Sequence, residues 1–460
     1  MLADFLLPPG IPRPPATVTE LAPSAGPGPE ASYAAAGWTA AGLGALVAAL
    51  RRGGKGLRAL PDGALLDAWA ATVEAFRDPA SPERRALEPA LAALCGLSPA
   101  GLEAGLDAVL GGVRREPAAA LLERAAILRK SRTTGAAAHA PVLVLLASNL
   151  PALAVQPLLP ALALRRPVLL KSPSAEPLFA PAFLAALVQR EPRLAGTVAA
   201  VTWQGGDATL EAPLLAAAGT VVAYGGAAAM ADLARRAPGK RLVEYGPKTS
   251  LAVVDLSGDP DRDPDSAPDG HGGAALQAVA AGLARDVALF DQRGCLSVAA
   301  VYVAGGMNTA MRLAAALETA LADLAARWPP GPATPAGLAG MAAVQQARLE
   351  AELRGLRRSA LPPGDGTVLV EPEPRLLASP GLRTVRVHPL ADLDRLPGIL
   401  APWRGRLQGA ALSGPAAWRL APRLAALGVC RCAAPGDLQS PDAAWHNGGI
   451  DPLLALSAEE

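Results

Sequence analysis

The sequence predicts an α/β protein in which a helical N-terminal region precedes two α/β units. Residues 1–130 place apolar side chains at helical spacing. From about residue 131, short apolar segments alternate with helical ones, which is typical of parallel sheets covered by helices on both faces. The segment 257–273 contains five Asp and three Pro and almost no apolar residue. Such a polar stretch indicates a boundary between domains.

The first region, residues 1–130, is expected to be mostly helical. Its apolar periodicity predicts helices at 31–50, 64–76, 82–94, 99–111 and 117–130. Proline stands at the start of the last three segments, where its missing N–H costs no helical hydrogen bond.

The rest of the chain is expected to form two α/β units and a tail. In the first unit, residues 131–256, the predicted strands are 142–147, 167–171, 197–203, 220–224 and 251–255. The helices predicted between them are 151–164, 177–189, 207–218 and 227–236. In the second unit, residues 257–430, we predict helices at 274–290, 307–327 and 338–356 and strands at 298–303, 367–370 and 384–388. Residues 431–460 have the composition of a loop-like tail that ends in a short apolar run.

The composition excludes several classes of function. The 42 Lys and Arg nearly balance the 41 Asp and Glu, which argues against a nucleic-acid partner. Aromatic residues make up 3% of the chain, too few for base-stacking platforms. Four cysteines do not make a disulfide framework, so a reducing cytoplasm is expected. The four histidines show no ligand spacing, and Cys430 and Cys432 have no second pair, so we predict no metal site.

One uncharged stretch is long enough to suggest a transmembrane helix. Residues 139–164 contain no Asp, Glu, Lys or Arg. Four prolines interrupt this stretch, and proline breaks helix continuity. We therefore expect a buried strand, a turn and a short apolar helix there, and no membrane span. The N-terminus lacks the basic segment of a signal peptide.

Cys295 is the strongest candidate for chemistry. It lies in FDQRGCLSV, residues 290–298, between a predicted helix and a predicted strand. A thiol on such a loop is held by a rigid scaffold and can be reached from a cleft. The thiolate is the nucleophile and needs nearby positive potential, which Arg293 is placed in sequence to supply. The alternative is that Cys295 is a small buried hydrophobic residue, as many free cysteines are.

Three polar side chains follow the ends of predicted strands. Asn149 comes directly after the first strand, where its amide could donate a hydrogen bond to a developing oxyanion. Lys171 and Ser174 lie at the end of the second strand, where a cation and a helix N-terminus can hold a ribose or a phosphate. The alternatives are a turn-forming Asn, a solvated Lys and an ordinary helix cap.

Glycine-rich turns and a charged pair complete the set of candidates. Gly225 and Gly226 stand between a strand and a helix, where the backbone can approach a pyrophosphate, and Gly206 lies in a similar turn. Such turns are also common without any ligand. Glu244 and Lys248 place a carboxylate and a cation near the expected crevice, although most such neighbours are solvated surface groups.

Taken in order, these segments resemble the acyl-CoA reductase family of the aldehyde dehydrogenase superfamily, typified by the fatty acid reductase subunit of bacterial bioluminescence. The motifs that carry the resemblance are SNLP (148–151), LLKSPS (169–174), WQGGD (203–207), VAYGG (222–226), EYGPKTS (244–250), DQRGCLS (291–297) and the closing segment 434–453. One departure is Val298, where the family's reductases usually carry proline.

The resemblance implies an aldehyde dehydrogenase-like fold. Residues 131–256 would be a Rossmann-type NADP-binding domain on which the helical region packs, and residues 257–430 a catalytic domain. It also implies NADPH-dependent reduction of a fatty acyl thioester to an aldehyde. Cys295 would be the nucleophile, and Asn149 and the backbone N–H of Cys295 would hold the oxyanion. The residues that would line the dinucleotide are Lys171, Ser174, Gly206, Gly225 and Gly226.

Glu244 aligns with the general base of hydrolytic aldehyde dehydrogenases. A thioester reductase must not hydrolyse its acyl-enzyme, so a water-activating base would be a liability. The acyl donor expected from the resemblance is coenzyme A, a carrier protein or an acylated partner enzyme, and the protein is expected to be a homo-oligomer. Two alternatives stay open: an aldehyde dehydrogenase that produces the acid, and a non-catalytic subunit that binds acyl groups or partners.

Overall fold

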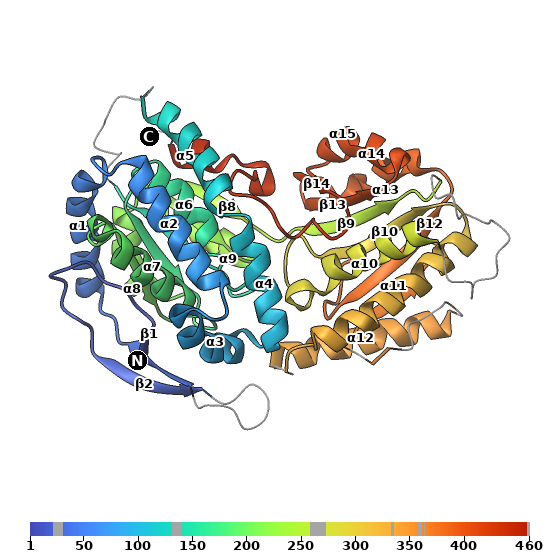
Figure 1. The fold of residues 1–460 in the computed structure, drawn as a ribbon, viewed down its shortest axis with the longest axis horizontal. Helices are drawn as coiled ribbons and strands as arrows, with labels where there is room; N and C mark the ends of the chain where they lie inside the picture. The colour runs from blue at the N-terminus through green and yellow to red at the C-terminus, as the bar shows by residue number, and fades with distance from the viewer. Residues whose placement is uncertain are drawn as a thin grey trace.

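A computed structural model shows two lobes, each built around a parallel sheet, with a helical region packed on the first (Figure 1). The structure describes residues 1–21, 31–130, 140–257, 273–332, 335–354, 356, 361–362 and 364–457, without the side chains of 335–338. Most of the polar segment 257–273 therefore lies outside the described residues. The parallel sheets covered by helices confirm the predicted α/β class.

The N-terminal region begins with a small sheet and continues as helices. Its elements are β1 (Leu2–Ala3), β2 (Ala16–Leu21), β3 (Ala31–Ala36), α1 (Ala40–Leu57), α2 (Asp62–Arg77), α3 (Pro82–Cys95), α4 (Pro99–Gly111) and α5 (Arg115–Lys130). The prediction of a helix from residue 31 was wrong, because β3 pairs antiparallel with β2 and parallel with β1. The first helix starts only after Thr39, whose hydroxyl accepts a hydrogen bond from the N–H of Gly42.

The first lobe contains a five-stranded parallel sheet in the order β6-β5-β4-β7-β8. Its elements are β4 (Val142–Leu145), α6 (Val155–Ala163), β5 (Val168–Ser172), α7 (Phe179–Arg190), β6 (Val198–Thr202), α8 (Ala208–Ala217), β7 (Thr220–Tyr224), α9 (Ala227–Arg236) and β8 (Arg241–Tyr245). The stretch 139–164 is thus a buried strand and a short helix, as predicted, where it is described. The sequence prediction missed β8, whose alternating polar residues suit a strand at the edge of a sheet.

The second lobe contains a six-stranded parallel sheet in the order β11-β12-β10-β9-β13-β14. Its elements are β9 (Thr249–Val254), α10 (Ala274–Ala288), the 3-10 turn η3 (Leu289–Gln292), β10 (Val298–Ala304), α11 (Met307–Arg327), α12 (Pro335–Leu353), β11 (Thr367–Val370), β12 (Thr384–Leu390), α13 (Leu396–Leu400), β13 (Leu407–Ser413), α14 (Pro415–Arg419), α15 (Ala421–Ala425) and β14 (Arg431–Ala433). We expected the strand at 251–255 in the first unit. Instead, β9 pairs with β10 and β13, so the chain changes sheets at 246–248, before residue 256.

This change of sheet brings two opposite sheet edges together. The chain leaves the carboxyl end of β8 at Tyr245 and enters the amino end of β9 at Thr249 after three residues. Since every strand in these two sheets is parallel to its neighbours, the carboxyl edge of the first sheet faces the amino edge of the second. This junction lies between the lobes in Figure 1.

The C-terminal segment returns from the second lobe to the first. After β14 it forms the short turn η6 (Asn447–Gly449) and the helix α16 (Pro452–Ser457), which packs on α6 (Figure 1). The guanidinium of Arg166 donates to the carbonyl of Leu456 at 2.8 Å, and Arg241 donates to that of Ala455 at 2.7 Å. The tail therefore joins the two lobes a second time.

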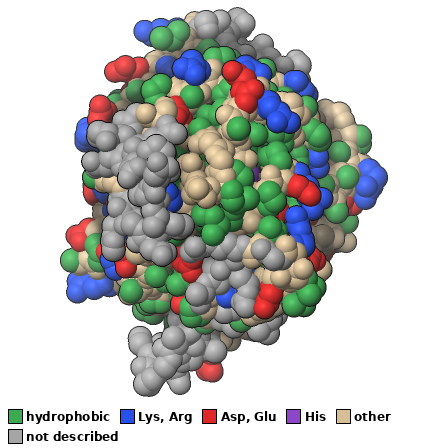
Figure 2. Space-filling model, turned by 90° about the vertical axis from the view of Figure 1, so that its right-hand side faces the viewer, with side chains coloured by type: hydrophobic (Ala, Val, Ile, Leu, Met, Phe, Trp, Pro, Cys, Tyr) green, Lys and Arg blue, Asp and Glu red, His purple; other side chains and the backbone are tan. Residues whose placement is uncertain are grey.

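The described helices and one face of the second lobe show how apolar and charged side chains are distributed. No single helix among them has both the length and the apolar composition of a membrane span; only α3 taken with α4 and α5, bent by 106°, reaches both. On the face of the second lobe seen in Figure 2, basic and acidic side chains are interspersed among apolar ones.

Two adjacent glycines at the end of α4 test how the tail packs on the helical region. A side chain at Gly112 would meet the carbonyl oxygen of Pro441 at 1.9 Å, whereas one at Gly111 would meet nothing within 4 Å. Gly112→Ala should lower the free energy of unfolding by about 1–3 kcal/mol through overpacking. Gly111→Ala should raise it by about 0.5–1 kcal/mol, because alanine favours a helix. Denaturant unfolding of both variants measures this, and equal effects would contradict the packing described.

Candidate active site

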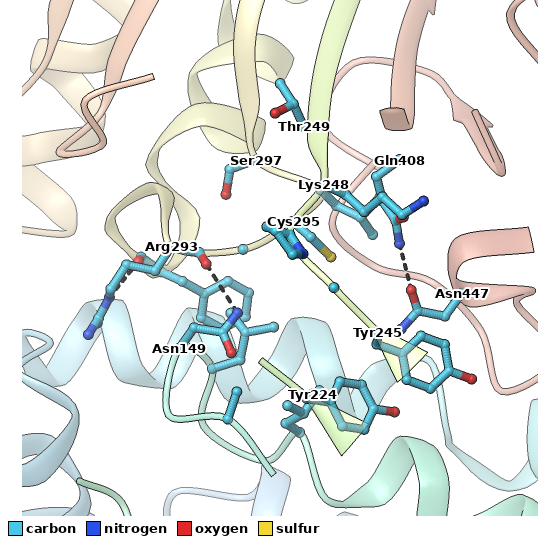
Figure 3. A pocket seen from close by; sticks show the side chains of 18 of the residues that line it. Asn149, Tyr224, Tyr245, Lys248, Thr249, Arg293, Cys295, Ser297, Gln408 and Asn447 are labelled. Carbon is cyan, nitrogen blue, oxygen red and sulfur yellow. Dashed lines mark hydrogen bonds between the residues drawn. The ribbon is translucent and has the colours of Figure 1, made fainter. Parts of the chain in front are cut away.

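A cavity of about 560 Å³ lies where the two sheet edges meet (Figure 3). Both lobes and the C-terminal segment contribute to its wall. The polar residues that line it include Asn149, Tyr224, Glu244, Tyr245, Lys248, Thr249, Arg293, Cys295, Ser297, Gln408, Gln439 and Asn447. The three catalytic candidates from the sequence, Cys295, Asn149 and Glu244, therefore line one cavity.

The loop that carries Cys295 runs from η3 to β10 and is tightly held. The hydroxyl of Ser250 in β9 donates to the carbonyl of Cys295 at 2.8 Å, and the N–H of Ser297 donates to the carbonyl of Gly294 at 3.0 Å. A side chain at Gly294 would lie 2.7 Å from Oε1 of Gln439, so Gln439 would have to shift to make room for it. Cys295 itself is half-buried. In Figure 3 its sulfur points toward Gln408 and Asn447.

The electrostatic surroundings of Cys295 differ from those expected from the sequence. Burial raises the pKa of the thiol to about 11, and nearby Cys430 adds to the increase. The backbone N–H groups of Cys295 and Leu296 and the charge of Lys248 act in the opposite direction. The expectation that Arg293 supplies this charge was wrong.

Arg293 is turned away from the sulfur (Figure 3). Its guanidinium donates to the carbonyl of Cys95 at 2.6 Å and to that of Phe290 at 3.0 Å. These main-chain acceptors hold the side chain against α3. Proximity in sequence predicted the wrong cation, because the direction of a long arginine side chain is set by the carbonyls to which it donates.

Asn149 lies in the loop after β4, on the opposite lobe from Cys295. Its Nδ2 donates to the main-chain carbonyl of Arg293 at 3.2 Å (Figure 3). This bond connects the Asn149 loop of one lobe to the cysteine loop of the other. It uses one of the two amide hydrogens, so the other N–H remains a donor.

Glu244 and Lys248 enter the cavity from the connection between the sheets. Glu244 is an exposed side chain on the edge strand β8. Lys248 is half-buried, and its ammonium donates to the carbonyl of Gly405 across the junction. The sequence placed both groups near the crevice, and the structure brings both into it.

The five residues suggested for dinucleotide binding lie on the carboxyl side of the first sheet, but only two line this cavity. Gly225 and Gly226 do so, and Gly226 precedes α9 with no side-chain cap and with open space where a side chain would stand. A helix N-terminus of this kind presents free N–H groups to an anion. Gly206 has a φ of +89° in the turn after β6, a conformation that favours glycine.

Lys171 and Ser174 lie outside the cavity lining. Lys171 is buried, its ammonium lies 5.6 Å from the ring centre of Trp203, and burial lowers its pKa. Ser174 is exposed, and α7 begins only at Phe179, so the expectation that Ser174 opens this helix was wrong. The carboxylate of Glu176 instead accepts hydrogen bonds from the N–H groups at the start of α7.

Sequence reasoning missed several cavity residues. Tyr224 and Tyr245 stack with ring centres 4.7 Å apart, and Gln408 donates to Oδ1 of Asn447 at 2.6 Å. Gln408 lies on β13, a strand that the sequence did not reveal. Asn447 lies in the closing segment that contributed to the family resemblance, so a signal for it was present.

Comparison with known proteins gives one family and one fold. The family described as acyl-CoA reductase (LuxC) matches residues 64–459. The long-chain acyl-protein thioester reductase of Vibrio harveyi is 24% identical over 255 residues, which cover 54% of this chain and 49% of that protein. Long-chain acyl-protein thioester reductase 2 of Photobacterium leiognathi is 27% identical over 165 residues, 35% of this chain and 31% of that protein. The chain thus matches half or less of the length of these relatives.

Solved structures show the same fold at low sequence identity. Aldehyde dehydrogenase C of Pseudomonas syringae is 15% identical with a TM-score of 0.65, and the match covers 94% of this chain and 88% of that one. A benzaldehyde dehydrogenase of Corynebacterium glutamicum is 13% identical with a TM-score of 0.66, over 98% and 94% of the two chains. The fold is aldehyde dehydrogenase-like, as the sequence predicted.

Lys248 provides a test of the electrostatics around Cys295. Lys248→Met removes a positive charge that favours the thiolate, so the pKa of Cys295 should rise further. Because only the thiolate is alkylated, iodoacetamide should modify Cys295 about two- to fivefold more slowly at pH 8, given tenfold per pKa unit. Mass spectrometry of the Cys295 peptide across pH measures the rate. Lys240→Met, at a lysine bound to carbonyls of the first lobe, serves as the control and should change nothing.

Proposed function

The chain belongs to the acyl-CoA reductase (LuxC) family, and from that premise we propose that it reduces an acyl thioester to an aldehyde with NADPH, through a covalent acyl group on Cys295. The observation that carries the proposal is the position of Cys295. Its loop stands at the junction of the sheets, in one cavity with Asn149 and the Gly225–Gly226 turn.

The first half of the reaction is an acyl transfer between two sulfur atoms. The sulfur of Cys295 attacks the thioester carbonyl, a new carbon–sulfur bond forms, and the bond to the donor sulfur breaks. The proton of Cys295 passes to the departing thiolate. Because nucleophile and leaving group are both thiols, the exchange is nearly balanced in energy and depends mainly on positioning. The tightly held cysteine loop suits such a step.

The oxyanion that forms in the attack needs hydrogen-bond donors. Asn149 has a second N–H left after its bond to the carbonyl of Arg293, and the backbone N–H of Cys295 is close to its own side chain. A preorganised donor of this kind contributes about 3–4 kcal/mol to the transition state. Asn149 therefore has two tasks, to join the loops and to stabilise the oxyanion.

The first sheet supplies a place for the dinucleotide. The turn at Gly225–Gly226, which is open at Gly226, and the uncapped start of α9 fit a pyrophosphate. NADPH supplies the hydride that reduces the acyl carbon. Cys295 keeps the resulting tetrahedral adduct attached until its carbon–sulfur bond breaks, which releases the aldehyde and the Cys295 thiolate; a proton taken up from solvent then restores the thiol. Lys171, Ser174 and Gly206 lie along the same sheet edge, and we assign them to the more distant parts of the dinucleotide.

The role of Glu244 distinguishes the proposed reduction from aldehyde oxidation, which would use its carboxylate as a base. Its exposed carboxylate lines the cavity and could activate water. Hydrolysis of the acyl-cysteine would waste the thioester, so the proposed reaction does not need Glu244 as a base. The acyl donors proposed are acyl-coenzyme A and, from the names of the relatives, acylated protein.

An assay with acyl-CoAs of graded chain length tests the proposed function. NADPH should be oxidised with formation of one aldehyde per cofactor, and radioactive acyl-CoA should label the protein when NADPH is omitted. Cys295→Ser should abolish the labelling, because its hydroxyl is a far weaker nucleophile. Cys430→Ser serves as a matched control and should keep the label. Turnover of aldehyde with NADP⁺ alone, and none with acyl-CoA, would refute the proposal.

Asn149→Ala should affect chemistry more than cofactor binding. Loss of one oxyanion donor should lower kcat about 100- to 1000-fold, while the Kd for NADPH should stay within about twofold. Steady-state kinetics and fluorescence titration of NADPH measure the two effects. Equal losses in both would indicate a structural role for Asn149 instead.

A further inference from the structure

The backbone just before Cys295 adopts an unusual conformation. Phe290, Asp291 and Gln292 have φ values of 57°, 50° and 63°, so three consecutive residues with side chains are left-handed. Leu382 and Arg383, directly before β12, have φ values of 51° and 57°. Residues other than glycine adopt this conformation only where the surroundings enforce it, and such positions concentrate at functional sites.

The two left-handed turns hold each other in the protein interior. The guanidinium of Arg383 donates to Oδ1 of Asp291 at 3.0 and 2.7 Å, and both side chains are buried. The second carboxylate oxygen of Asp291 accepts a hydrogen bond from the N–H of Gly331 at 3.1 Å. The carboxylate is therefore satisfied by partners from two other segments.

Gln292 closes the loop that carries the nucleophile. Its Nε2 donates to the carbonyl of Val298 at 2.8 Å and to that of Thr384 at 2.7 Å, and its Oε1 accepts from the N–H of Thr384 at 2.7 Å. The side chain is buried. It thus ties residue 292 to residue 298 and both to β12, and Cys295 stands midway between the two tied ends.

The cysteine loop also binds the side-chain amide of Asn149, which belongs to the first lobe. The carbonyl that accepts the hydrogen bond of Asn149 belongs to Arg293, the residue directly after Gln292. The ring of Phe290 fills the space above Gly105 of α4, where a side chain would come within 2.5 Å of it. Phe290 and Arg293, at the two ends of this turn, therefore bring the cysteine loop against the N-terminal helices and the Asn149 loop.

We propose that Gln292 is a positioning residue: its side chain, together with the Arg383–Asp291 pair, holds Cys295 and Asn149 at the spacing that acyl transfer requires. The inference rests on the proposed function, since it states how the nucleophile of that reaction is placed. Both Nε2 hydrogens of Gln292 are used by the carbonyls of Val298 and Thr384, and its Oε1 already accepts from the N–H of Thr384, although the residue lines the cavity.

Gln292→Met tests this role, because methionine keeps the length of the side chain and removes its hydrogen bonds. We expect kcat for acyl-CoA reduction to fall about 100-fold, the loss typical of a reacting group misplaced by about 1 Å. The KM for acyl-CoA and the Kd for NADPH should stay within about twofold. Iodoacetamide should modify Cys295 at least about threefold faster, because the freed loop exposes the thiol, while Cys95 in the helical core should stay unreactive.

Arg165→Met is the matched control. Arg165 is also left-handed, with a φ of 61°, is buried, and bonds to Asp62 and to main-chain carbonyls, but it lies before β5 at the amino edge of the first sheet. The variant should lower the melting temperature and leave kcat and the alkylation rate of Cys295 unchanged.

Two results would overturn the inference. One is a kcat of Gln292→Met within about twofold of the parent protein; the other is an equal loss of kcat in Arg165→Met. If Gln292→Met does not fold, Arg383→Lys, which keeps the charge but not the two-pronged bond to Asp291, should show the same split with about a tenfold loss of kcat. Absence of any thioester reduction by the parent protein would refute the proposed function alone. The alkylation rates would then decide the inference, and an unchanged rate for Cys295 in Gln292→Met would reject it.

Discussion

The three-residue connection between β8 and β9 is the constraint on which the site depends. A chain this short cannot cross from one end of a sheet to the other, so it must join the carboxyl edge of the first sheet to the amino edge of the second. Loops that leave strands in one lobe therefore face loops that enter strands in the other. Asn149 and Gly225 follow strands, Cys295 precedes one, and the connection itself adds Lys248.

The helical region and the C-terminal segment contact the junction and hold the two sheet edges in place. The helical region reaches the junction through Arg293, which is bonded to the end of α3, and through α4, whose Gly105 lies under Phe290. The C-terminal segment crosses from the second lobe to the first and brings Asn447 to the cavity wall beside Gln408. Segments from distant parts of the chain thus meet at one place, around the loop that carries the thiol.

The placement of Cys295 combines burial with restraint. The half-buried thiol has a pKa raised to about 11 and is mostly protonated at neutral pH. The N–H groups of Cys295 and Leu296 and the nearby ammonium of Lys248 counter only part of this increase in pKa. Because nucleophile and leaving group are both thiols, the exchange does not need a strongly depressed pKa, and its rate depends on the thiolate fraction and on geometry. The left-handed turn at 290–292 supplies that geometry.

The sequence alone determined the fold class, most helices and buried strands, and the candidates Cys295 and Asn149, because apolar periodicity and the residues at strand ends are local properties. It did not determine that Ala31–Ala36 is a strand, since alanine favours a helix until a neighbouring strand pairs with it. Nor did it decide in which sheet β9 lies, which depends on pairing between distant segments. Only the tertiary structure shows that Lys248, and not Arg293, is the cation that favours the thiolate. The reason is that the guanidinium of Arg293 donates to carbonyls that lie away from the sulfur.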